Sequence, residues 1–388
     1  MNVFINRLEQ LFEEMVTLRR HLHQWPELSH EEVETPLFIA NYLRELGLVV
    51  REGVGGRGVV ATLKGAQPGL TIGLRADFDA LAIQELTEIP YKSKVNGVMH
   101  ACGHDGHTAA LLIVAKTLSE LRDHVKGTVV FIFQHAEELA PGGAKAMIED
   151  GCLDGVDVIY GAHLWSPSPI GQISTCKGAI MAAADRFEIV IEGKGGHGAQ
   201  PHEAIDPIVA ASQFIVQLQS IVSRNVDPLK SAVVSIGHLQ ASNPFNVIAQ
   251  QVELKGTVRT FDEQERTFIK ERIEQLLKGV SIASGTTYSY RYVEGYPPVI
   301  NDPNEAAFIL QLAEDIHQTK EALEIAPMMI GEDFAYYLQH IPGAFYLVGA
   351  MPTSGKYYPH HHPMFNFEES AMLHSAKIMV QAVLQKNG

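Results

Sequence analysis

Strand-like apolar runs alternate with helix-like stretches through much of the chain, and this alternation most constrains its fold. Residues 58–65, 70–81, 127–138 and 155–165 read as strands, and 107–121 reads as an apolar-faced helix. Strands and helices that alternate at this spacing are typical of βαβ units, in which the strands lie parallel in one sheet. We therefore expect an α/β fold built on a mixed sheet with substantial parallel pairing.

The pattern changes between residues 184 and 294. This stretch reads as strand, helix, strand, strand, helix, strand, which is the βαββαβ order of a compact α+β module. Beyond it, a helix at 304–316 and a strand at 343–350 return to the α/β pattern. At roughly 100–200 residues per domain, a chain of 388 residues has room for two domains. We expect one discontinuous domain, 1–183 plus 295–388, interrupted by an inserted domain at 184–294.

Two predicted helices carry readable end signals. Thr35 is a plausible N-cap because Pro36 follows it at the first helical position, and Gly47 stands where that helix should end. Asp262 precedes an amphipathic stretch and is the expected cap of a second helix.

Charge and cysteine content exclude several classes of protein. The formal net charge is −15 and no dense Lys/Arg run is present, so neither nucleic acid nor an anionic membrane is expected as the main partner. No stretch approaches the ~18 uninterrupted apolar residues of a membrane helix. The mixed, acidic N-terminal sequence does not resemble a signal peptide. Three cysteines, Cys102, Cys152 and Cys176, suggest no disulfide framework and fit a reducing, cytoplasmic environment.

Potential metal ligands gather where the predicted strands end. In an open α/β sheet, ligands bind beyond the carboxyl ends of the strands, so side chains at these positions converge. The same positions have ordinary explanations: a lone histidine is usually structural, and a Cys-Gly-His turn can simply start a helix. Their shared location favours a metal site over these separate explanations. The candidates are Arg75, Asp77, Asp79, Cys102, His104, Gln134, His135, Glu137, Glu138, His163, His360, His361 and His362.

The pair Glu137–Glu138 points from metal binding toward catalysis. Cys, His and Glu are ligands of zinc and similar first-row metals. Adjacent residues just past a strand do not easily point the same way, so one glutamate can bind metal while the other faces a substrate. A free carboxylate beside a metal-activated water is the arrangement of metal-assisted hydrolysis. A storage or structural site would not require the second carboxylate.

Nine segments together resemble the bacterial amidohydrolase branch of the aminoacylase/carboxypeptidase metallopeptidase superfamily. That branch includes hippurate hydrolases, N-acyl-amino-acid amidohydrolases, N-acetyldiaminopimelate deacetylases and auxin-conjugate hydrolases. The resemblance implies a dinuclear metallopeptidase-like catalytic domain with an inserted lid and dimerisation domain. The segments are RRHLHQWPELSHEE, GLRADFDAL, MHACGHDGHTA, FQHAEE, GAHLW, GKGGHGAQPHEAIDP, GTVRTFD, GEDFAYY and HHHPMF.

The resemblance also assigns the residues of the centre. It implies two divalent ions (zinc, manganese, cobalt or nickel), with Glu137 as general base and acid. Related dizinc peptidases have a His-x-Asp motif where this chain has Arg75-Ala76-Asp77, so Asp77 would support the ligands at most. His361 is preferred within its triplet because it precedes Pro363 by two positions, with His360 and His362 left open. The implied ligands are Cys102, His104, Glu138, His163 and His361.

In the inserted domain the resemblance singles out three residues. His197, in a glycine-rich loop, would approach the active site of its own or a partner subunit, although such a loop could also be a plain exposed turn. Asn246 and Arg259 would hold polar groups of the substrate. The implied protein is a homodimer or homotetramer that hydrolyses N-acyl amino acids to a carboxylic acid and a free amino acid. The alternatives are a dipeptidase or carboxypeptidase with the same chemistry, and a non-catalytic relative that binds metal or ligand.

Overall fold

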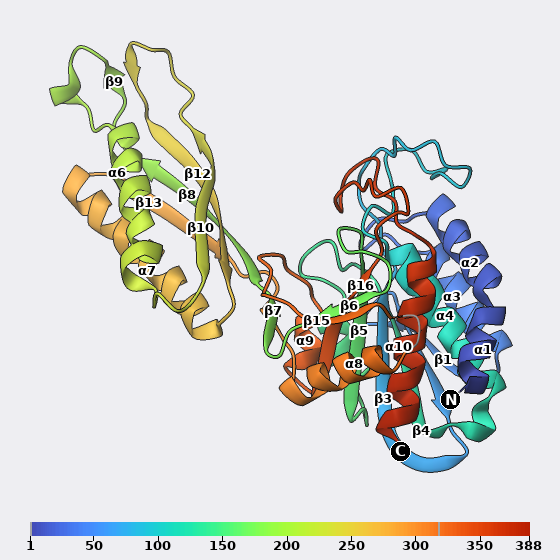
Figure 1. Cartoon of the computed structure of the whole chain (residues 1–388). Helices are drawn as coiled ribbons and strands as arrows, with labels where there is room; N and C mark the ends of the chain where they lie inside the picture. The colour runs from blue at the N-terminus through green and yellow to red at the C-terminus, as the bar shows by residue number, and fades with distance from the viewer. Residues whose placement is uncertain (1, 317–318) are drawn as a thin grey trace. The chain divides into compact units, whose positions relative to one another are not determined.

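The computed structural model describes residues 2–316 and 319–388 (Figure 1). The chain forms two compact units: the first comprises 1–180, 299–327 and 333–388, and the second comprises 181–298 and 328–332. The second unit thus extends slightly beyond the expected 184–294 at both ends. It also includes the short segment 328–332, which the sequence pattern did not separate.

A mixed eight-stranded sheet forms the centre of the first unit. β3 pairs in parallel with β4 and β5, and β5 pairs in parallel with β16. The pairs β1–β2, β2–β4 and β16–β6 are antiparallel. The α/β fold with a mixed sheet is therefore confirmed. In sheet order the strands are β1 (Val49–Val54), β2 (Gly58–Lys64), β4 (Lys126–Gln134), β3 (Gln67–Asp77), β5 (Val158–Trp165), β16 (Gly343–Gly349), β6 (Gln172–Thr175) and β15 (Glu321–Glu324).

Helices bury the two faces of this sheet. β16 is buried along its whole length, as expected of a central strand covered on both faces. α4 is also buried on nearly all sides, because it packs against β3 as well as α2 and α10. The helices of this unit are α1 (Asn2–Gln10), α2 (Phe12–Gln24), α3 (Glu34–Glu45), α4 (His104–Glu120), α5 (Ala144–Glu149), α8 (Pro303–Asp315), α9 (Ala335–Leu338) and α10 (Ser370–Lys386).

The second unit has the expected βαββαβ order. Its antiparallel sheet has the strand order β10-β12-β8-β13, and Phe187, Phe214 and Ile273 lie in its fully buried core. A two-stranded ribbon of β9 (Gly196–His197) and β11 (Val247–Ile248) is added to it. The main elements are β8 (Ala183–Glu192), α6 (Pro207–Ser220), β10 (Ala232–Gln240), β12 (Gln251–Thr260), α7 (Glu263–Ser284) and β13 (Thr287–Val293).

Two of the three predicted helix ends are confirmed. The Asp262 side chain accepts hydrogen bonds from Gln264 N and Glu265 N at the start of α7, and Gly47 follows α3 with a φ of 73°. The Thr35 cap is wrong, because α3 begins at Glu34 without a side-chain cap hydrogen bond from its N-cap residue. The carboxylate of Glu27 accepts the backbone N–H groups of residues 33–35 instead.

No helix within 2–316 and 319–388 combines the length and hydropathy that a membrane crossing requires.

Candidate metal centre

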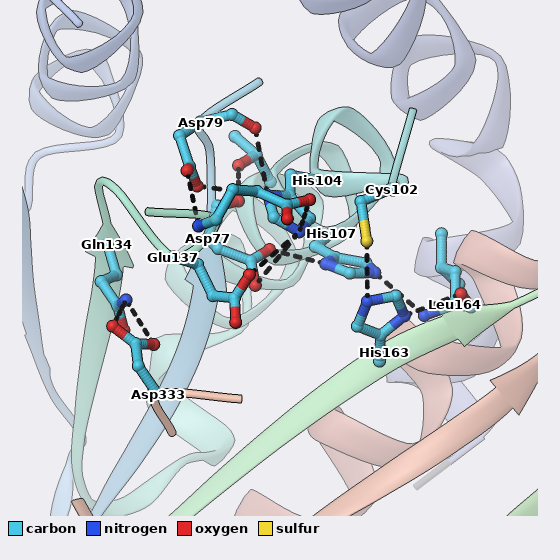
Figure 2. A network of polar contacts seen from close by, with 12 residues as sticks. Asp77, Asp79, Cys102, His104, His107, Gln134, Glu137, His163, Leu164 and Asp333 are labelled. Carbon is cyan, nitrogen blue, oxygen red and sulfur yellow. Dashed lines mark hydrogen bonds and ion pairs between the residues drawn. The ribbon is translucent and has the colours of Figure 1, made fainter. Parts of the chain in front are cut away.

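Several of the predicted ligands meet at one edge of the large sheet (Figure 2). β3, β4, β5 and β16 are parallel, so their carboxyl ends share that edge. Cys102 and His104 lie at the start of α4, which follows β3 in the chain, and Glu137 and Glu138 follow β4. His163 lies near the end of β5. The convergence therefore follows from topology.

His104 has the orientation of a metal-binding histidine. Its Nδ1 donates to the backbone oxygen of Asp79 at 3.0 Å, which leaves Nε2 unprotonated in the neutral ring. Nε2 is buried without a hydrogen-bond partner among the described residues, 3.8 Å from Glu138 Oε1 and 4.0 Å from Glu137 Oε2. Burial lowers the pKa of His104, but the charges of Asp77 and Asp79 outweigh it and raise the pKa to about 10. The surroundings of this nitrogen thus favour a cation.

Cys102 and His163 form a second pair of donors. Cys102 Sγ lies 3.4 Å from His163 Nε2, while His163 Nδ1 donates to the backbone oxygen of Leu164 at 2.8 Å. Burial and neighbouring imidazoles hold the pKa of His163 well below its ordinary value, so its ring is neutral. Burial and the carboxylates of Glu138 and Glu137 raise the pKa of Cys102 well above its ordinary value. Ionisation of the thiol therefore needs a nearby cation.

The two glutamates both face His104 because the chain turns sharply after β4. Ala136 has a φ of 53°, in the left-handed region that costs an L-residue about 1–2 kcal/mol. Glu138 Oε1 is buried without a hydrogen-bond partner among the described residues, and its Oε2 lies 3.3 Å from His361 Nε2. Both carboxylates are therefore near the same imidazole, which the adjacent positions alone did not predict.

Two members of the histidine triplet reach the centre. His361 faces Glu138, is about half exposed, and has a φ of 66°. His360 is more buried, and its Nδ1 lies 3.7 Å from Cys102 Sγ while its Nε2 accepts from Ser166 N at 3.4 Å. Burial lowers the pKa of His360 to about 3. His362 instead accepts from Met364 N and stacks on Tyr358.

Asp77 supports other side chains of the site. Its Oδ1 accepts from His107 Nδ1 at 2.6 Å and its Oδ2 accepts from Arg75 at 2.7 Å. His107 Nε2 accepts from Leu164 N at 2.9 Å, so both ring nitrogens of His107 are used within the protein. The guanidinium of Arg75 also donates to Gln134 and Asp333. Arg75 therefore stands at the position where related dizinc peptidases have a histidine, and its guanidinium binds the carboxylates of Asp77 and Asp333.

The assembled side chains could hold divalent cations. Four groups within the first unit have ligand atoms within 4.8 Å of one another, and Cys102, His104 and Glu138 each belong to two of them. Sulfur, imidazole nitrogen and carboxylate oxygen suit zinc and neighbouring first-row metals. Two buried ligand atoms without hydrogen-bond partners, His104 Nε2 and Glu138 Oε1, match such an occupant. The groups are Cys102–His163–His360, Cys102–Glu138–His361, His104–Glu137–Glu138 and Asp77–His104–His107.

The other three predicted residues belong to the second unit. His197, in β9, is exposed, and its Nδ1 accepts from Ala199 N at 3.1 Å, so the neutral ring carries its proton on Nε2. Asn246 is also exposed. Arg259, in β12, donates to the backbone oxygen of Val258 at 3.0 Å, and burial lowers its pKa.

A buried ionic network that sequence reasoning missed holds the start of α4. Asp105, the residue after His104, accepts from Arg19 at 2.8 Å and contacts His23 Nδ1 at 2.9 Å. His23 Nε2 lies 3.4 Å from Glu85. The available signal was the position of Asp105 in the first turn of a helix, where a carboxylate is favoured. Its partners are distant in sequence, so no local pattern identified them.

The sequence and structure of known proteins match this chain closely. An N-acyl-L-amino acid amidohydrolase of Geobacillus stearothermophilus is 49% identical over 298 residues, covering 76% of this chain and 80% of the relative. An N-acetyl-L-cysteine deacetylase of Bacillus subtilis is 44% identical over 376 residues, covering 97% and 88%. The solved YXEP protein of Bacillus subtilis, described as a dinuclear metal binding peptidase from the M20 family, is 37% identical with a TM-score of 0.85, covering 98% and 99%. The model of peptidase family M20/M25/M40 matches residues 73–385, and the chain therefore belongs to this family.

Proposed function

We propose that this protein is a metal-dependent amidohydrolase that cleaves N-acyl amino acids into a carboxylic acid and a free amino acid. The observation that carries this proposal is the meeting of Cys102, His104 and Glu138 with a second carboxylate, Glu137, at one edge of the sheet. The names of the Geobacillus and Bacillus relatives support the substrate class, since both refer to N-acylated amino acids.

We propose that the centre holds two divalent ions, as the description of the Bacillus subtilis structure suggests by similarity. When bound, such ions would polarise the scissile carbonyl and make a water molecule more acidic at neutral pH. Their identity among zinc, manganese, cobalt and nickel depends on supply as much as on the ligands. The proposed ligands are Cys102, His104, Glu138, His163 and His361, and His360 is the alternative within the triplet.

Glu137 is the proposed general base and acid. Its carboxylate lies beside His104 Nε2, the proposed ligand atom, so it would take the proton of a water that attacks there. It would then give that proton to the nitrogen of the leaving amino acid, which completes hydrolysis of the amide. Asp77 would keep its supporting position, since it is already bonded to Arg75 and His107.

The second unit is the proposed lid and dimerisation domain of a homodimer or homotetramer. His197 would donate from Nε2 to the oxyanion of the attacked carbonyl, which agrees with the tautomer that its contact with Ala199 sets. Asn246 and Arg259 would bind polar groups of the substrate. His197 would act in its own or in a partner subunit.

The substrate class is tested by a panel of N-acetyl, N-benzoyl and indole-acyl amino acids together with dipeptides. The metal content of the purified protein is measured alongside. We expect release of free amino acid from at least one N-acyl compound at a higher kcat/KM than from any dipeptide. Preference for dipeptides would instead assign a dipeptidase, and no turnover of any compound by metal-loaded protein would contradict the proposal.

A further inference from the structure

A short N-terminal segment, Ser29–Glu32, touches the turn that carries the two catalytic-site glutamates. Leu28 forms a parallel bridge with Ala80, so this segment lies beside the chain that leaves β3. The turn 136–139 makes three hydrogen bonds with the side chains of residues 30, 32 and 79. They are Ala136 N to Glu32 Oε1 at 2.9 Å, Glu138 N to Asp79 Oδ2 at 3.0 Å, and His30 Nε2 to Leu139 O at 3.0 Å.

The bond from Ala136 stabilises the strained point of the turn. Ala136 has a φ of 53°, which L-residues rarely adopt and which persists only when the surroundings impose it. Its N–H donates to a carboxyl oxygen of Glu32, and because burial raises the pKa of Glu32 to about 7, this oxygen is the acceptor in either protonation state. Rotation of Ala136 toward an ordinary φ would redirect Glu137 and Glu138 away from His104. The acceptor therefore holds both glutamates.

Packing alone does not explain a glutamate at position 32. The side chain is fully buried, yet Oε2 has no hydrogen-bond partner among the described residues, and Arg57 Nε lies 3.9 Å away. Burial of a carboxylate with one oxygen unsatisfied costs stability. That cost indicates a role that an apolar side chain could not fill. The neighbouring Ser29 holds Asp79 at 2.6 Å, and Asp79 in turn accepts from Glu138 N.

We propose that Glu32 is a positioning residue, whose carboxylate fixes the left-handed Ala136 and so aims Glu137 at the reaction and Glu138 at the metal. Its catalytic consequence rests on the proposed function, whereas its effect on metal affinity does not. Groups that orient metal ligands from behind typically contribute ~10–100-fold to metal affinity or activity.

Three variants of full-length protein separate the position of the acceptor from its charge. Glu32→Gln keeps an oxygen in reach of Ala136 N. Glu32→Asp keeps a carboxyl group but withdraws it by one methylene, and Glu32→Ala removes the acceptor. Glu31→Ala is the matched control, since Glu31 is exposed. The measurements are kcat, KM and the Zn²⁺ dissociation constant from chelator competition, at temperatures well below each variant's melting point.

We expect Glu32→Asp and Glu32→Ala to lose ~10–100-fold in kcat and in Zn²⁺ affinity, with KM changed less. We expect Glu32→Gln and Glu31→Ala to stay close to wild type in both. If Glu32→Ala does not fold, the contrast between Gln and Asp decides alone. Equal behaviour of Gln and Asp, or wild-type Zn²⁺ affinity in both Asp and Ala, would overturn the proposal. Inactive wild-type protein would refute the proposed function. The Zn²⁺ dissociation constants of the variants would then still test the positioning role of Glu32.

Discussion

At the scale of single residues, protonation and orientation distinguish ligands from supports. His104 and His107 are both buried near Asp77, yet only His104 has a nitrogen without a hydrogen-bond partner among the described residues. The sequence predicted the residue types and their meeting place. It could not predict the left-handed φ of Ala136, because alanine gives no local signal for that conformation.

One prediction at this scale concerns the thiol of Cys102. Burial and adjacent carboxylates raise its pKa, so only a bound cation would make it a thiolate. A thiolate that binds metal should resist alkylation until the metal is removed. Mass spectrometry after timed alkylation should show slow labelling of Cys102 in metal-loaded protein and faster labelling after chelation under mildly unfolding conditions. Equal labelling in both states would argue that Cys102 is not a ligand.

At the scale of elements, the sequence predicted a helix end correctly where the capping side chain belongs to the N-cap residue itself. Asp262 caps α7 through its own side chain, so sequence sufficed. The start of α3 differs from the prediction because Glu27, from outside the helix, accepts the N–H groups of residues 33–35, and the helix begins at Glu34. α4 gives the same lesson, since its first turn depends on Arg19 and His23 from α2.

The contribution of the His23–Asp105 contact between α2 and α4 to the stability of the fold should depend on pH. Burial lowers the pKa of His23, but hydrogen bonds to Asp105 and Glu85 outweigh this and raise it above the ordinary 6.5. A raised folded-state pKa means that the charged ring stabilises the fold fully below about pH 6.5 and loses this effect as the pH rises through the folded value. The difference in melting temperature between wild type and His23→Gln should therefore be larger at pH 6 than at pH 9. A difference that is constant or grows with pH would contradict this.

At the scale of the whole molecule, the pattern change in the sequence predicts an inserted domain at 184–294, and the second unit comprises 181–298 and 328–332. It did not reveal that 328–332 belongs there, because that segment has no pattern of its own. The proposed contribution of this unit to catalysis concerns His197, which lies far in sequence from every proposed ligand.

We expect His197→Ala to lose ~10²–10³-fold in kcat, as for removal of one oxyanion donor, while metal occupancy remains full. Steady-state kinetics and metal analysis of the same preparation test this. Normal kinetics would leave His197 as an exposed loop residue. If His197 acts across subunits, mixing His197→Ala with Glu137→Gln should restore activity, because one site of the mixed dimer keeps both residues. No recovery despite demonstrated subunit exchange would place His197 in its own subunit.

In the proposed function, Glu137 transfers protons at a metal centre that other residues assemble. The most direct measurement compares turnover of an N-acyl amino acid by wild type and Glu137→Gln, each chelated and then reloaded with divalent metal. Wild type should lose activity on chelation and recover it on reloading. Glu137→Gln should regain the same metal content yet stay ~10²–10⁴-fold slower, the usual contribution of a general acid–base group. Wild-type turnover by reloaded Glu137→Gln would refute proton transfer by Glu137, and unchanged turnover by fully chelated wild type would refute the role of the metal.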